Sequence, residues 1–441
     1  MKHKLSFLLT SFLLMLVFAV HAGERRIEFT EYTLDNGLHV ILHEDNTTPN
    51  VVVNIMYHVG AKNEQPDRTG FAHFFEHLMF EGSKHIERGE FAEIVEAAGG
   101  SLNAYTSYDV TNYFVLLPSN QLELGLWLES ERLLHPVIDS IGIATQKDVV
   151  TEEMKQVRDN RPYGRMMTET MMRVFTVHPY QSDILGKDEH IRHATYEDIV
   201  AFHDMFYVPN NAVLVVTGDI DIEETRELVE RYFGDIPGGT HEIFRPNVVE
   251  PPRTAELRDT VYDQIQLPAY LQAYAIPAQG SEDYYALRML GSLLSQGQSS
   301  RLYRRLVVEE QLALTVSANA LGLEDPGMHM VMAIPNMGVD PIALEEIIDE
   351  ELARVRTELI SEEDLEKLKN QVESRMVNSN TTIARRAMNL ANYHLLYGDA
   401  DLINTEIDRY MAVTREDIME VAQRYLHENN RVVLFYMPEP I

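Results

Sequence analysis

Hydrophobic residues along the chain follow two spacings, and together these predict strands and helices in two similar halves. Alternating or β-branched runs predict strands, and apolar residues that recur every three or four positions predict helices. In the first half, strands are predicted within 29–42, at 51–59, within 101–117 and at 212–217. Helices are predicted there at 91–98, 121–134, 149–158, 196–206 and 222–233.

The second half repeats this arrangement. Strands are predicted at 270–275, 312–321, 329–334 and the C-terminus, and helices at 283–294, 341–359, 362–378, 382–396 and 415–425. The segment TYEDI at 195–199 resembles TREDI at 414–418, and the same offset of 219 residues continues into the following turn and strand. Helices and strands alternate irregularly, so we predict an α+β fold of two homologous domains, each a mixed β-sheet with helices packed on one face.

Proline and glycine mark the boundary between the halves, at 237–239 and 251–252. We therefore predict an N-terminal domain at 23–240, a linker at 241–254 and a C-terminal domain at 255–441.

Residues 1–22 have the composition of a secretory signal peptide. Lys2 and Lys4 precede an apolar stretch at 5–20, and small residues end it just before Gly23. We predict cleavage at that point, export to the periplasm and a mature chain without a stable membrane span. An uncleaved membrane anchor is the alternative. The absence of cysteine agrees with a bacterial periplasm.

The net charge of the chain makes some classes of binding partner unfavourable on electrostatic grounds. The net charge is −32, while the apolar fraction of 45% is ordinary for a globular protein. Such an acidic surface repels nucleic acid and anionic lipid, so neither is expected as a partner. Such a surface could favour basic peptides, but a merely solvated acidic surface is the better explanation of the charge.

The most informative motif lies within the apolar segment 70–82, which has glycine at both ends and no proline. On a helix, His73 and His77 lie one turn apart on one face, and Glu76 reaches the same face. Two imidazoles so placed can hold Zn²⁺, and a nearby carboxylate can take a proton from a zinc-bound water. An exposed polar face is the simpler interpretation, but the phenylalanines around the motif favour burial.

A zinc site needs a third protein ligand, and the candidates are Glu152 and Glu153. On the predicted helix, Glu153 lies on the apolar stripe formed by Val149, Val150 and Val157. Glu152 lies on the polar face instead. A carboxylate on a buried stripe needs a cation, so Glu153 is the predicted ligand.

These residues resemble those of the pitrilysin or insulinase-type zinc peptidases, the inverzincins, over essentially the whole mature chain. Members carry the H-x-x-E-H helix and a glutamate ligand about 75 residues later, and Glu153 lies 76 residues after His77. The resemblance implies Zn²⁺ held by His73, His77 and Glu153, with Glu76 activating water. It also implies a half-clamshell fold and hydrolysis of peptides or unstructured segments in an enclosed chamber.

The segment 99–104 matches a further family pattern, Gly-Gly-x-x-Asn-Ala. The resemblance implies that Asn103 and Ala104 bind the substrate backbone on an edge strand. An ordinary turn or capping role for Asn103 is the alternative. The length of the chain is similar to that of the subgroup containing mitochondrial processing peptidase subunits and bacterial paired peptidases.

The chain departs from the family in two places. Gln146 stands where many members have a glutamate, seven residues before the third ligand. Val307 and Leu314 stand where active members have the arginine and tyrosine that stabilise the oxyanion. Neither side chain donates a hydrogen bond, and losing one such donor typically costs about 10²–10³ in rate.

Three hypotheses follow. In the first, this chain is the zinc subunit of a heterodimer, and a homologous chain without zinc supplies the arginine and tyrosine. In the second, a homodimer or monomer uses other donors, such as Tyr105, Tyr108 or Arg304. In the third, the chain is a non-catalytic core or scaffold subunit, but relatives of that kind usually lose the His-Glu-His set.

Overall fold

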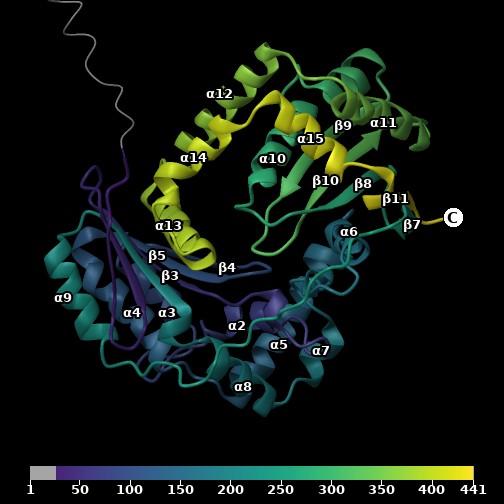
Figure 1. Cartoon of the computed structure of the whole chain (residues 1–441). Helices are drawn as coiled ribbons and strands as arrows, with labels where there is room; N and C mark the ends of the chain where they lie inside the picture. The colour runs from purple at the N-terminus through teal and green to yellow at the C-terminus, as the bar shows by residue number, and fades with distance from the viewer. Residues whose placement is uncertain (1–25, 441) are drawn as a thin grey trace, which may run out of the picture.

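A computed structural model describes residues 26–440, which form two β-sheet units joined by an extended segment (Figure 1). The predicted signal peptide lies outside the described residues. Both sheets contain parallel and antiparallel strand pairs, and helices pack against them. The predicted α+β fold class is confirmed.

The first sheet has six strands in the order β1-β2-β6-β3-β5-β4. Their bounds are β1 Thr30–Thr33, β2 His39–Glu44, β3 Asn50–Tyr57, β4 Ser101–Thr106, β5 Thr111–Pro118 and β6 Ala212–Gly218. The helices of this half are α2 Phe71–Leu78, α3 Glu90–Ala97, α4 Leu122–Leu134, α5 Ser140–Met154, α6 Met166–Val174, α7 Asp188–His193, α8 Tyr196–Phe206 and α9 Ile222–Phe233. Strand β4, which contains Asn103 and Ala104, is an edge strand.

The second sheet has five strands in the order β7-β11-β8-β10-β9. Their bounds are β7 Leu257–Asp263, β8 Ala269–Ile276, β9 Ala313–Leu321, β10 Gly327–Pro335 and β11 Arg431–Pro438. The helices of this half are α10 Glu282–Ser295, α11 Ile342–Thr357, α12 Glu362–Ser379, α13 Ile383–Tyr397, α14 Leu402–Ala412 and α15 Arg415–Tyr425.

The internal repeat extends further than the sequence motif that revealed it. The offset of 219 residues carries α8 onto α15 and β3 onto β8 without a change in length. Both helices begin with a threonine and an aspartate three residues later that cap each other reciprocally, Thr195 with Asp198 and Thr414 with Asp417. The two halves therefore share a core topology.

In each half, one helix packs against the sheet of the other half (Figure 1). Helix α13 packs Ile383, Ala387 and Leu390 on the face of the first sheet that carries Val52 and Val213. Its counterpart α6 packs on the second sheet. Met166, Met171 and Val174 of α6 lie in one hydrophobic cluster with Leu271, Val432 and Leu434 of the sheet. Helix α4 packs on the opposite face of the first sheet, with Val53 and Ile55, and α10 on the opposite face of the second, with Tyr270 and Tyr274, so the central strands are buried on both faces.

A buried ionic cluster also joins the halves. The Lys62 ammonium lies 3.0 Å from a carboxylate oxygen of Asp109, in the first half. It also pairs with Glu324 and, at 3.0 Å, with Asp325, both between β9 and β10. Burial lowers the pKa of Lys62, but the surrounding carboxylates outweigh it and raise the pKa overall. Tyr180 closes the cluster by donating to Asp109 at 2.5 Å.

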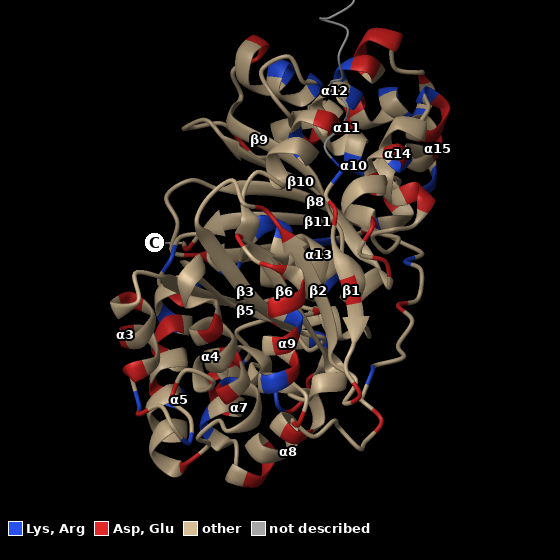
Figure 2. Ribbon diagram, turned by 90° about the vertical axis from the view of Figure 1, so that its left-hand side faces the viewer, with Lys and Arg blue, Asp and Glu red and all other residues tan. Residues whose placement is uncertain are grey.

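Acidic residues are spread over the surface helices of both halves rather than gathered on one face (Figure 2). This distribution agrees with a solvated acidic surface. Among the described helices, none combines the length and the apolar composition needed to cross a membrane.

Candidate metal centre

The motif helix α2 begins at Gly70, whose φ of +89° is left-handed, and it has no capping side chain of its own. Glu64 replaces the cap: its carboxylate accepts hydrogen bonds from the backbone N–H groups of Gly70 and Ala72, each at 2.8 Å. Burial raises the pKa of Glu64 to about 8. Nothing in the local sequence pointed to Glu64, because it lies across a loop from the helix that it caps.

The structure brings His73, His77 and Glu153 together. A carboxylate oxygen of Glu153 lies 3.1 Å from Nε2 of His77 and 3.7 Å from Nε2 of His73. One ligand atom from each residue lies within 4.8 Å of the other two. The two imidazole rings meet edge to face at 76°, with centroids 4.8 Å apart. The rings are therefore not stacked, and their ligand nitrogens lie close enough together to share one ion.

The charge states of this group also fit a metal. Burial lowers the pKa of His73 to about 4, which keeps its imidazole neutral and able to donate a lone pair. The hydrogen bond with His77 lowers the pKa of Glu153, which keeps it a carboxylate. Two imidazoles and one carboxylate form a donor set typical of catalytic zinc.

Glu153 rather than Glu152 reaches the histidines, but the predicted apolar stripe is partly wrong. Val150 is buried, whereas Val149 and Val157 are 43% and 40% exposed. The α-helical spacing ends at Met154, where a wider π-helical turn begins, so Val157 leaves the buried face. Glu152 is exposed and pairs with Lys155 at 3.1 Å.

Glu76 lies beside the cluster and is held by the edge strand. Oγ1 of Thr106, the last residue of β4, donates a hydrogen bond to Glu76 at 2.6 Å. Burial raises the pKa of Glu76 above its ordinary value, which makes it a stronger base than an exposed glutamate. Thr106 thus connects the carboxylate to the strand that contains Asn103 and Ala104.

Along β4, exposure alternates, and Asn103 is exposed while Ala104 is half-buried with Thr106. The Asn103 side-chain oxygen accepts a hydrogen bond from the N–H of Ala104 at 2.9 Å. The Asn103 side chain is therefore engaged with the backbone of its own strand.

Gln146 donates a hydrogen bond to Glu81, which follows α2, and Glu81 also pairs with Arg88. A glutamate at position 146 would place two carboxylates together, so the glutamine is compatible with Glu81. This contact ties α5, which carries Glu153, to the end of the motif helix.

The two family positions for oxyanion donors hold no donor here. Val307 packs against the core of the second half, and Leu314 is 56% exposed at the start of edge strand β9. Among the alternatives, Arg304 pairs with Glu309 at 3.3 Å. Tyr108 is buried against Tyr180, while Tyr105 is partly exposed on β4.

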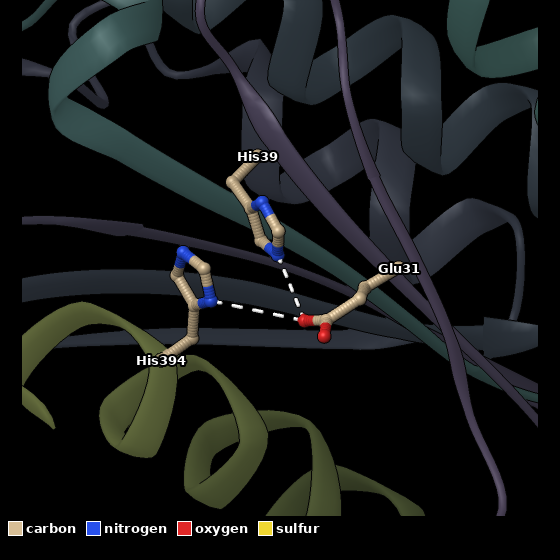
Figure 3. Close-up of side chains that lie close together, drawn as sticks. All are labelled: Glu31, His39 and His394. Atoms are coloured by element: carbon tan, nitrogen blue, oxygen red, sulfur yellow. Dashed lines mark hydrogen bonds and ion pairs between the residues drawn. The ribbon is translucent and has the colours of Figure 1, made fainter. Parts of the chain in front are cut away.

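A second cluster with the same donor types has a different geometry (Figure 3). Glu31, His39 and His394 lie close together, with Glu31 3.1 Å from His39. The two rings are stacked at 9°, with centroids 3.5 Å apart. The lone pair of an imidazole lies in the plane of its ring, and an ion between two stacked rings 3.5 Å apart would lie out of the plane of at least one of them.

Replacing His77 with alanine is therefore expected to remove the most tightly bound zinc, because only two ligands remain. Competition with a chromophoric chelator measures the loss. His39→Gln is the matched control, taken from the stacked cluster, and is expected to leave the tight affinity unchanged. Equal zinc affinity in wild type and His77→Ala would contradict the assignment.

Comparison with known proteins places the chain in a family. Residues 39–187 match the model described as insulinase (peptidase family M16), and residues 193–372 match the peptidase M16 inactive domain. The zinc protease PqqE of Helicobacter pylori is 28% identical over 423 residues, 95% of each chain.

Solved structures agree. A protease from Helicobacter pylori has a TM-score of 0.88 at 28% identity, covering 93% of this chain and all of its own. An M16-like peptidase from Alicyclobacillus acidocaldarius has a TM-score of 0.83 at 25% identity, covering 95% of this chain and 100% of its own. The chain belongs to the insulinase-type, or M16, peptidase family.

Proposed function

We propose that this chain is a zinc-dependent endopeptidase subunit that hydrolyses peptides or unstructured polypeptide segments. The observation that carries the proposal is the convergence of His73, His77 and Glu153, with Glu76 beside them. Similarity to a zinc protease over almost the whole chain supports it.

The role proposed for each residue follows from its position in the metal centre. His73, His77 and Glu153 would hold Zn²⁺, which when bound polarises a carbonyl and acidifies water. Glu76 accepts the proton of the attacking water and returns it to the leaving amine. Thr106 orients Glu76 through its hydrogen bond of 2.6 Å.

The peptide would lie along β4. This strand pairs only with β5 in its sheet, so its other edge has backbone groups available for an extended peptide. Asn103 and Ala104 lie in the middle of this strand, and Thr106 at its end touches Glu76. A peptide added at this edge would be led toward the zinc ligands.

We also propose that the active form is a heterodimer. Val307 and Leu314 supply no oxyanion donor, so a homologous chain with the arginine and tyrosine but without the His-Glu-His set would complete the chamber. The predicted export signal supports a periplasmic location for the proposed assembly.

The test compares turnover of an unstructured peptide by the purified chain alone and after mixing with such a homologous chain. We expect the mixture to be faster by about 10²-fold or more, since oxyanion donors contribute on that order. Full turnover by the chain alone would reject the heterodimer and favour self-sufficiency. In that case, simultaneous loss of Tyr105, Tyr108 and Arg304 as donors should abolish activity.

One observation favours a second candidate function. Residues 193–372 match a domain described as inactive, which is compatible with a scaffold subunit. A scaffold would hold no zinc at His73, His77 and Glu153 and would remain inactive with any partner chain. The retained metal ligands favour the peptidase.

A further inference from the structure

A third group of metal-ligating side chains lies outside the catalytic centre. It contains His85, from the loop after α2, with Glu131 and His135 from the end of α4. One ligand atom from each residue lies within 4.8 Å of the other two. Glu131 lies in the last turn of α4, and His135 directly follows the helix as its C-cap, with its backbone N–H donating to the carbonyl of Glu131.

Ring orientation separates this group from the stacked cluster. The rings of His85 and His135 meet edge to face at 80°, with centroids 5.6 Å apart. This angle resembles the 76° between His73 and His77 and contrasts with the 9° of the stacked pair. The rings of His85 and His135 are therefore not stacked, and one ligand nitrogen of each lies close enough to the other to share one ion.

The carboxylate of this group is buried and already oriented. Glu131 accepts a hydrogen bond from Oγ of Ser83 at 2.6 Å on one oxygen. Its other oxygen lies 2.9 Å from Nδ1 of His85. Ser83 therefore acts as the outer hydrogen-bond partner that fixes a ligating carboxylate. The side chain of Glu131 is only 8% exposed, whereas His85 is 51% exposed, which leaves one side open to solvent.

Backbone contacts hold the two segments together independently of any ion. The N–H of Lys84 donates to the carbonyl of His135 at 3.0 Å, and Ser83 forms a β-bridge with Pro136. The three ligands are thus brought together without a long flexible loop, which lowers the entropic cost of binding.

We propose that His85, Glu131 and His135 form a second divalent-metal site, selective for Zn²⁺ and similar nitrogen-binding transition ions. Two imidazoles and one carboxylate suit zinc, and solvent would complete the coordination. Bound there, the ion fixes the loop that runs from α2 to Arg88. Arg88 pairs with Glu81, and Glu81 accepts a hydrogen bond from Gln146 on α5. An ion at this site would therefore stabilise the contact between α2 and α5, the two helices that carry the catalytic ligands.

The experiment uses the full chain in a His77→Ala background, so that the catalytic centre contributes little. After equilibrium dialysis against micromolar Zn²⁺, we expect about one zinc per chain, lost in a triple variant that adds His85→Ala and His135→Ala. Zinc should raise the melting temperature of the single variant but not of the triple variant. Circular dichroism verifies that both are folded.

Adding His39→Gln and His394→Gln to the same background is the matched control and should leave one zinc bound. Tetrahedral Co²⁺ absorption bands that disappear with His85 and His135 give a second, spectroscopic readout. No zinc in the His77→Ala chain overturns the proposal. Zinc that persists in the triple variant overturns it too, because the bound metal is then an adventitious ion only.

Discussion

Replacing Glu76 with glutamine is expected to reduce peptide hydrolysis by about 10³-fold or more, because general base catalysis contributes on the order of 10²–10⁴. Glutamine preserves the shape of the side chain and still accepts the hydrogen bond from Thr106, but it cannot take a proton from water. Turnover of a fluorogenic peptide, measured with any required partner chain present, gives the loss.

Zinc content separates this effect from loss of the site. Glu76 is not one of the three ligands, so the Glu76→Gln chain should bind zinc as tightly as wild type. Thr106→Val is the graded control: it removes one hydrogen bond to a charged group, worth about 1.5–3 kcal/mol, and should cost roughly ten- to a hundredfold in rate. A Glu76→Gln chain with activity within tenfold of wild type would exclude Glu76 as the base.

Replacing Lys62 with methionine is expected to destabilise the folded chain by about 3–5 kcal/mol, the usual cost of breaking a buried ion pair. The Lys62 side chain is 3% exposed, and its single ammonium pairs with the carboxylates of Asp109, Glu324 and Asp325. Methionine fills a similar volume, so the loss comes from carboxylates left without their cation. Urea denaturation measures the free energy of unfolding.

Lys155→Met is the matched control. Lys155 pairs with Glu152, but its side chain is 51% exposed, and such surface pairs contribute about 0–1 kcal/mol. Equal destabilisation by the two substitutions would show that the Lys62 cluster does not hold the halves together.

Elements with a strong local pattern could be predicted closely. The bounds of α8, α9 and α15 agree with the prediction residue for residue, because capping residues and apolar spacing both mark them. Helix α6 was not predicted. Its buried face is made largely of methionines that contact the sheet of the other half, so the interaction that stabilises it is distant in sequence.

In the candidate site too, some residues could be predicted from local spacing and others depend on contacts distant in sequence. His73, Glu76 and His77 follow from helical spacing, and Glu153 follows from its spacing together with the family resemblance. Thr106, Glu64 and Glu81 act through contacts across loops and strands, which no sequence spacing encodes. Gln146 was recognised as a departure, but its pairing with Glu81 needed the structure.

The exchange of α6 and α13 restricts how the molecule can move. A motion that separated the two sheets within one chain would move α13 away from the first sheet and α6 away from the second. Val52 and Val213 of the first sheet and Leu271 and Val432 of the second would then be exposed to solvent. Exposure of that much apolar surface is costly. The two halves of one chain are therefore expected to move together, and in the proposed heterodimer an opening that admits a peptide would occur at the contacts between chains.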